Sequence, residues 1–278
     1  MSVFMNHYLL KSLLKSKLGL FAFPLFIYLM SCQSIEETQT PSGDTTNQAV
    51  YLYVASSLES LVGEINQQYK LRYPSRQIFT SLLGSQTARM QIEHGAPSGI
   101  FISAAKSHIN ILEKQHKIGE WQKFATTNIL LLAQKGTTVK KFQELNLARK
   151  IGIGTKKVPI GHYAWSLLHA FGQQHPQWFK QVTLNILTQE LSARALKGRF
   201  KRKEVDYAFL YEHDYLPLEG SQIISLPKEL IPLSKVTFYI ATTIHKTNIS
   251  PSSAVQDWFH LSMSSQGKMI QQKYGLRR

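Results

Sequence analysis

The sequence predicts an α/β fold with largely parallel sheets. Short apolar runs of strand length alternate along the chain with segments whose apolar residues recur at helical spacing. Hydrophobic residues make up 43% of the 278 residues and charged residues 18%, which is the balance of a packed globular protein and not of a disordered chain. No internal repeat and no Pro- or Gly-rich linker divides the chain after Gln48.

The elements follow from these patterns in order. Residues 50–55 form an apolar run, and apolar residues from Leu58 to Ile65 then recur at helical spacing, which indicates a strand followed by a helix. The same reasoning predicts further strands at residues 77–83, 99–103, 128–133, 150–153, 182–187, 207–211 and 236–243. Further helices are predicted around residues 88–92, 109–112 and 163–171, from about Leu191, and at 254–262 and 265–274.

Residues 1–32 have the features of an export signal. Lys11, Lys15 and Lys17 precede an apolar run at residues 18–30, which is shorter than a membrane-spanning helix requires. The run ends in Leu-Met-Ser-Cys, and Cys32 is the only cysteine, so no internal disulfide can form. This ending resembles the bacterial lipobox, which implies cleavage before Cys32 and a lipid on its thiol. A buried free thiol after a short anchor helix is the alternative.

A polar segment at residues 33–48 follows the cysteine. It has almost no apolar side chains, which predicts a flexible tether. A tether between lipid and folded part holds a protein at a membrane and leaves it free to reorient. We therefore expect an exported protein, periplasmic or at the cell surface, that is anchored to a membrane by its lipid.

The chain carries a large positive charge. The formal net charge is +15, and +12 remains without the three leader lysines. Such an excess is typical of proteins whose partner is nucleic acid, an anionic membrane or an anionic ligand, and export argues against nucleic acid. The basic run at residues 197–203 is expected to be a solvated face near a helix end, with contact to anionic lipid or to a permease as the alternative.

Polar residues follow several predicted strands at the points where the next helices begin. Ligands of open α/β sheets settle beyond the carboxyl ends of the strands, and the unpaired N–H groups of helix starts favour anions. Ser56 and Glu59 are spaced as a capping box, which leaves Ser57 free to offer a hydroxyl and an N–H. Any one such serine is more often a simple helix cap than a ligand contact. The other junctions carry Gly84-Ser85, Pro159-Ile160-Gly161, Leu191-Ser192 and, at the end of its strand, Tyr211.

Together and in this order, these segments resemble the molybdate-binding receptors of ABC importers. The resemblance covers residue 50 to the C-terminus and implies the class II periplasmic-binding-protein fold, with two α/β lobes joined by crossing strands near residues 127–132 and 236–240. Lobe 1 then comprises residues 49–128 plus 240–278, and lobe 2 comprises residues 129–239. The matching segments are YLYVASSL from residue 51, SQTARMQIEHGAPSGIFISA from 85, KIGIGTKKVPIGHYA from 150 and EVDYAFLY from 204.

The resemblance also implies a ligand. We expect a monomer without a cofactor that captures molybdate or tungstate as a tetrahedral oxyanion and delivers it to an ABC permease. Tungstate-type relatives place carboxylates on the metal centre, whereas the matching positions here are Val158 and Leu210, which favours a plain tetrahedral anion. Carried over position by position, the contacts are the hydroxyl and N–H of Ser57 and Ser85, the N–H of Ile160, an N–H near Leu191 or Ser192, and the hydroxyl of Tyr211.

These contacts are all neutral hydrogen-bond donors. Removing a dianion from water costs much free energy, and hydrogen bonds to a charged group contribute about 1.5–3 kcal/mol each, so about five to eight of them can offset that cost. A site without acceptors disfavours protonated phosphate, whose O–H lacks a partner there, whereas sulfate stays open. Ser57→Ala or Ser85→Ala is therefore expected to weaken binding with little change in thermal stability.

Other functions find less support in the sequence. Glycine-rich phosphate loops and a Gly-x-Ser-x-Gly motif are absent, so no enzyme is expected. The ten histidines lack metal-ligand spacing, so no protein-ligated cation is expected. A ferric-ion receptor of the same fold relies on paired tyrosines, and Tyr211 has no adjacent partner. The alternatives that stay open are a same-fold receptor for sulfate or another anion, and a lipoprotein that serves as an interaction or sensor module without transport.

Overall fold

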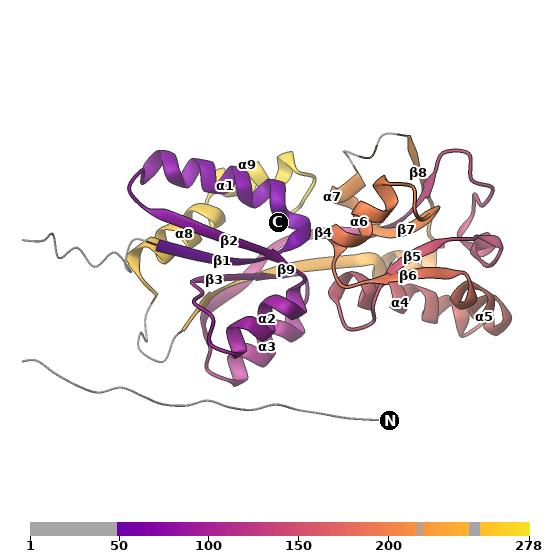
Figure 1. Ribbon diagram of the computed structural model, residues 1–278, viewed down its shortest axis with the longest axis horizontal. Coiled ribbons are helices and arrows are strands. Elements are labelled where there is room, and N and C mark those ends of the chain that lie inside the picture. Colours follow the sequence, from indigo (N-terminus) through magenta and orange to yellow (C-terminus); the bar gives the residue numbers. More distant parts are fainter. Residues whose placement is uncertain (1–48, 216–217, 219, 245–250) are drawn as a thin grey trace, which may run out of the picture. The chain divides into compact units, whose positions relative to one another are not determined.

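One sheet runs through the part of the chain that the structure describes. The computed structural model describes residues 49–215, 218, 220–244 and 251–278, so the expected leader, Cys32 and tether lie outside the described residues. Within them, nine strands follow the order β2-β1-β3-β9-β4-β7-β5-β6, with β8 paired to β4 (Figure 1). No helix in these ranges is long and apolar enough to cross a membrane.

The bounds of the elements are as follows. The strands are β1 (Ala49–Ala55), β2 (Gln77–Leu83), β3 (Ile100–Ser103), β4 (Ile118–Gln134), β5 (Ile151–Gly154), β6 (Ile186–Glu190), β7 (Tyr207–Tyr211), β8 (Ser221–Ile224) and β9 (Lys235–Thr243). The α-helices are α1 (Glu59–Arg72), α2 (Ser85–Glu93), α3 (Lys106–Lys114), α4 (Pro159–Gly172), α5 (Pro176–Leu184), α6 (Ala193–Lys201), α7 (Glu212–Tyr215), α8 (Ser253–Met263) and α9 (Ser265–Lys273). Short 3-10 helices occur at Ser56–Leu58, Phe142–Leu147 and Lys228–Ser234.

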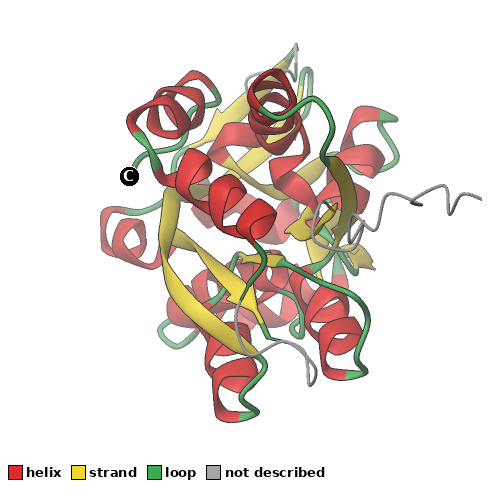
Figure 2. Ribbon diagram, turned by 90° about the vertical axis from the view of Figure 1, so that its left-hand side faces the viewer, coloured by secondary structure: helices red, strands yellow, loops and turns green. Residues whose placement is uncertain are grey.

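The first lobe is built around β1, which lies between β2 and β3 and runs parallel to both. Leu52 and Val54 point to one face of β1 and are fully buried in the core that α1 and α8 help to form. Tyr53 and Phe101 belong to the opposite face, where they pack with residues of α2 and α3. Helices therefore cover both faces of this part of the sheet (Figure 2).

Strands β4 and β9 connect the lobes. They pair antiparallel from Ile118 opposite Thr243 to Asn128 opposite Lys235. From Ile129 onward β4 pairs with β7, so one continuous strand belongs to the sheets of both lobes. The lobe boundaries expected from the sequence stay a prediction, but the strands that carry the chain across are these two.

The second lobe repeats the arrangement of the first. Its strand β5 lies between β6 and β7 and runs parallel to both. Helices α4 and α6 both contact β5 and lie on opposite sides of it in Figure 1. The parallel prediction is thus confirmed for the pairs around β1 and β5, whereas β4 and β9 make antiparallel pairs with their neighbours.

Two local predictions were wrong. A strand was expected at residues 182–187, but α5 extends to Leu184 and β6 begins only at Ile186. The helix begins with a proline at its first position, where no N–H is needed, and it buries Trp178 and Val182, which are four residues apart on one face.

The capping box expected from Ser56 and Glu59 is also absent. Ser56 opens a 3-10 turn, so α1 starts later, with Leu58 at its cap position and no side-chain capping bond. The Glu59 carboxylate instead lies 3.4 Å from the guanidinium of Arg194 on α6, in the other lobe. Both side chains are about half exposed, so this ion pair contributes little to stability.

Candidate functional site

A small cavity lies where the turns after β1 and β2 face helix starts of the second lobe. Its volume, counted as the space open to the centre of a water molecule, is about 20 Å³. A single water needs roughly 10–15 Å³ by this measure, so only a compact guest suits the arrangement. Leu191 does not line the cavity and is 68% exposed. The other expected contacts all line it: Ser57, Ser85, Ile160, Ser192 and Tyr211.

Ser57 reaches the cavity from the turn that follows β1. It lies within the 3-10 helix Ser56–Leu58, which ends the strand and directs the chain into α1. Its Oγ is buried and has no hydrogen-bond partner in the part of the chain that the structure describes. A buried hydroxyl without a partner costs free energy in the unliganded protein, and an anion in the cavity would supply the missing acceptor.

Ser85 is the first residue of α2 and is almost fully buried. Its Oγ accepts a hydrogen bond from the N–H of Ala104 at 3.1 Å, so its own proton stays available for a ligand. The carbonyl of Ala104 in turn accepts a hydrogen bond from the Tyr163 hydroxyl of α4 at 3.4 Å. Ala104 therefore links a donor of the first lobe to a helix of the second.

Ile160 offers a backbone N–H at the start of α4. Pro159 is the first residue of this helix, and the first intrahelical bond is donated by His162 to the carbonyl of Val158 at 2.8 Å. The N–H groups of Ile160 and Gly161 precede that bond and have no carbonyl of the helix to pair with. The helix is 14 residues long, so the positive end of its dipole adds to their attraction for an anion.

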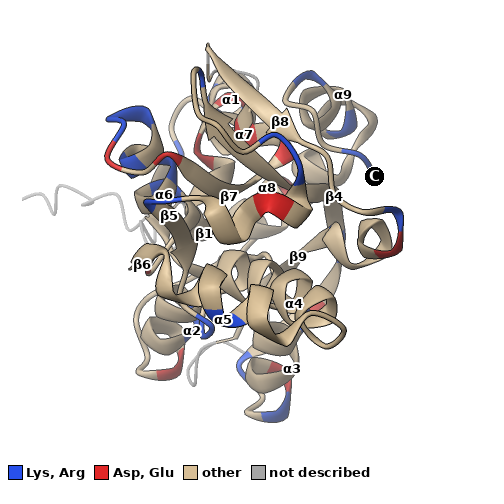
Figure 3. Ribbon diagram, turned by 90° about the vertical axis from the view of Figure 1, so that its right-hand side faces the viewer, with Lys and Arg blue, Asp and Glu red and all other residues tan. Residues whose placement is uncertain are grey.

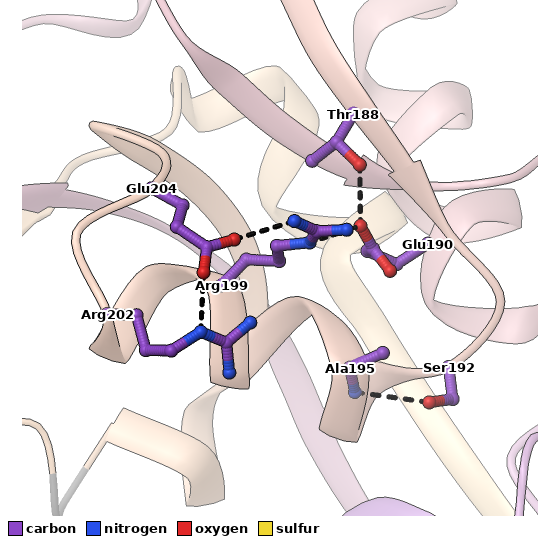
Figure 4. A network of polar contacts seen from close by, with 7 residues as sticks. All are labelled: Thr188, Glu190, Ser192, Ala195, Arg199, Arg202 and Glu204. Atoms are coloured by element: carbon purple, nitrogen blue, oxygen red, sulfur yellow. Dashed lines mark hydrogen bonds and ion pairs between the residues drawn. The ribbon is translucent and has the colours of Figure 1, made fainter.

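The start of α6 contributes Ser192. Its Oγ accepts the N–H of Ala195 at 3.1 Å as an N-cap, which fixes the hydroxyl at the helix start and, as at Ser85, leaves its own proton available (Figure 4). Ala193 also lines the cavity and was not expected from the sequence, because an alanine side chain carries no hydrogen-bonding group that would mark it. A Cβ added at Gly84 of the first lobe would lie 2.6 Å from the Leu191 carbonyl oxygen, which shows how closely the lobes approach here.

Tyr211 closes the cavity at the end of β7. It is 2% exposed, and burial raises the pKa of its phenol well above the ordinary value, with smaller contributions from Tyr163 and Asp214. The hydroxyl therefore stays protonated at neutral pH and can donate a hydrogen bond.

Among the residues that the structure describes, no charged side chain lines the cavity. Its polar groups are hydroxyls and backbone amides from both lobes, which can surround an anion with donors but cannot exchange a proton with it at neutral pH. Within the described ranges, no group of three His, Cys, Asp or Glu side chains is arranged to hold a metal ion. The chemistry available at this site is hydrogen bonding to a compact anion.

A larger groove of about 850 Å³ lies beside the cavity and is lined by cations of α6 together with Glu59, Glu190 and Asp214. Figure 3 shows the Lys and Arg positions of α6 in blue. Much of this charge is paired within the same lobe. Arg199 bonds to Glu190 and Glu204, and Arg202 bonds to Glu204 (Figure 4). These two arginines lower the pKa of Glu204 to about 2. The basic run at residues 197–203 therefore largely contacts acids of its own lobe.

Comparisons with known proteins agree with this geometry. Residues 50–277 match the family of bacterial extracellular solute-binding proteins. The molybdate-binding protein ModA of Mycobacterium tuberculosis is 24% identical over 203 residues, which are 71% of this chain and 74% of the relative. The periplasmic molybdate-binding protein of Azotobacter vinelandii has a TM-score of 0.69 at 16% identity, over 82% of this chain and 99% of that one. The sulfate-binding protein SubI of M. tuberculosis has a TM-score of 0.67 at 14% identity, over 83% and 86%. The expected two-lobed class II fold is confirmed.

Proposed function

The chain belongs to the family of bacterial extracellular solute-binding proteins, and on that premise we propose that it captures molybdate or tungstate as a tetrahedral oxyanion. The anion is held by the hydroxyls of Ser57, Ser85 and Tyr211 and by backbone N–H groups at Ile160 and Ser192. The protein is exported, carries its lipid on Cys32 and delivers the anion to an ABC permease.

One observation carries the proposal: the cavity between the lobes is small, uncharged and bordered by donors from both sides. A dianion bound there receives hydrogen bonds from both lobes only when they are closed. Ligand binding and closure are therefore coupled, as the delivery of a captured solute to a permease requires. The buried Ser57 hydroxyl that lacks a partner supports the same proposal, since an anion would satisfy it.

Sulfate is the second candidate ligand. The uncharged donor set that suits molybdate suits any tetrahedral dianion without a proton, and a sulfate-binding protein shares the fold. Charge and hydrogen bonding do not separate these anions, so their discrimination depends on how closely the donors fit the length of the metal–oxygen or sulfur–oxygen bond.

Calorimetric titration of the detergent-purified full chain with molybdate, tungstate, sulfate and phosphate tests the proposal. We expect molybdate and tungstate to bind tightly and phosphate to bind at least a hundredfold more weakly at pH 7. Tighter binding of sulfate than of molybdate would transfer the proposal to the second candidate. Absence of heat with all four anions would refute an oxyanion receptor.

A further inference from the structure

Tyr211, the only aromatic side chain among the described residues that line the cavity, stacks against His213. The two ring centroids lie 5.4 Å apart and the ring planes differ by 9°. Phe238 of β9 meets both rings edge-on, at 5.7 Å from each centroid. Three rings thus pack together beside the cavity, and of the three only Tyr211 is among the residues that line it.

His213 also contacts both strands that connect the lobes. Its Nδ1 lies 3.3 Å from Oγ1 of Thr127 on β4, and Phe238 lies on β9. Thr127 is buried at the point where β4 passes from one sheet to the other. The neighbouring Glu212 accepts a hydrogen bond from Asn128 of β4 at 2.7 Å. The start of α7 is therefore fastened to the same crossing strand by two consecutive side chains.

We propose that His213 is a positioning residue, which holds the Tyr211 ring so that its hydroxyl points into the oxyanion cavity and which ties that orientation to the crossing strands. This inference rests on the proposed function, because it assigns to His213 a role in oxyanion binding without any contact to the anion. It predicts that the affinity for the anion depends on a side chain outside the cavity wall.

The charges around the imidazole agree with this role. Burial lowers the pKa of His213 and Lys197 adds to that effect, whereas Asp214, the backbone of Ser57 and Glu212 oppose it. Asp214 is itself engaged, because its Oδ1 accepts a hydrogen bond from Lys197 at 2.8 Å. The ring is therefore neutral at pH 7, and a neutral imidazole can either donate to the Thr127 hydroxyl or accept from it.

A double-mutant cycle with molybdate as the probe tests the inference. Tyr211→Phe removes the hydroxyl and is expected to weaken binding about tenfold or more. His213→Ala is expected to weaken binding about tenfold in the parent protein but by less than about threefold in the Tyr211→Phe background, because its effect passes through the missing hydroxyl. His213→Phe, which keeps a ring against Tyr211, is expected to recover most of the affinity. His94→Ala, an exposed histidine at the end of α2, serves as the unchanged control.

Each other outcome has a definite meaning. Equal weakening by His213→Ala in both backgrounds, or no weakening in either, would overturn the positioning role while leaving the proposed function intact. Circular dichroism and thermal unfolding show whether the alanine variant folds. If it does not, the cycle is closed with His213→Leu, which fills the space without a ring, and a loss of affinity that is additive with that of Tyr211→Phe would equally overturn the role. Failure of the parent protein to bind any of the four anions would overturn the proposed function, and this inference with it.

Discussion

Replacing Ser57 by alanine separates ligand binding from folding. The Ser57 Oγ is buried without a hydrogen-bond partner, so its removal breaks no bond in the unliganded protein. A hydrogen bond to a charged ligand contributes about 1.5–3 kcal/mol, which corresponds to a roughly 10- to 150-fold weaker Kd for molybdate. We expect this loss in calorimetric titration at pH 7, with the melting temperature of the unliganded protein unchanged or slightly raised.

Ser85 supplies the contrast. Its Oγ accepts the buried N–H of Ala104, so Ser85→Ala leaves that donor unpaired, at a cost of about 1–3 kcal/mol in stability as well as a similar loss of affinity. The structure therefore leads us to expect unchanged stability for Ser57→Ala alone, whereas the sequence suggested it for both variants. Ser60→Ala, at an exposed position of α1, is the matched control. The reasoning is refuted if Ser57→Ala lowers the melting temperature as much as Ser85→Ala does, or if it binds molybdate with parental affinity.

Three further predictions follow from other contacts. Gly84→Ala places a Cβ against the Leu191 carbonyl across the lobes and should weaken molybdate binding at least tenfold. Gly63→Ala, which has open space around it, should keep the parental affinity. Equal affinities of the two variants would show that the lobes close differently. Molybdate at 100 times its Kd adds about 2.7 kcal/mol of stability and should raise the melting temperature by roughly 5–10 °C, an effect that phosphate at the same concentration should not match. Burial lowers the pKa of His108 to about 4 from an ordinary 6.5, so the unfolded chain binds this proton first as the pH falls. Stability should accordingly drop by up to about 3 kcal/mol from pH 7 to pH 4, and urea titrations of His108→Leu should show a smaller drop.

Elements whose pattern depends only on neighbouring residues were predicted well from the sequence. The strand at the start of the described chain and the strand that ends at Tyr211 are short, apolar and bounded by helix starts, and both exist within one residue of their expected limits. The segment 182–187 fits either a strand or a helix by its apolar spacing. Packing of Trp178 and Val182 into the core selected the helix, and that contact involves residues distant in sequence.

The long crossing strand β4 was likewise predicted from the sequence only in part. Only residues 128–133 of β4 were expected, although the strand begins at Ile118. Its first half carries exposed charged residues such as Glu120 and Lys123, whose strand conformation depends on the antiparallel partner β9 more than 100 residues away. A pattern within a short window does not contain that partner.

The candidate site, too, was predicted from the sequence only in part. Ser57 and Ser192 stand at similar positions, near a helix start, and no feature of the sequence distinguishes them. In the structure the Oγ of Ser57 has no partner, whereas that of Ser192 caps its own helix. Ala193 lines the cavity although it was not expected to, and Leu191, one of the two residues expected to supply the fourth contact, does not line it and is exposed.

The sequence by itself determined the alternating α/β architecture and the kind of chemistry at the helix starts, because apolar periodicity and the small polar residues of turns act over a few neighbouring positions. The tertiary structure decided which hydroxyls remain free, how small the cavity is and how closely Gly84 approaches Leu191. Whether a donor is available to a ligand depends on which group lies across from it after folding, and that group can be more than a hundred residues away in the chain.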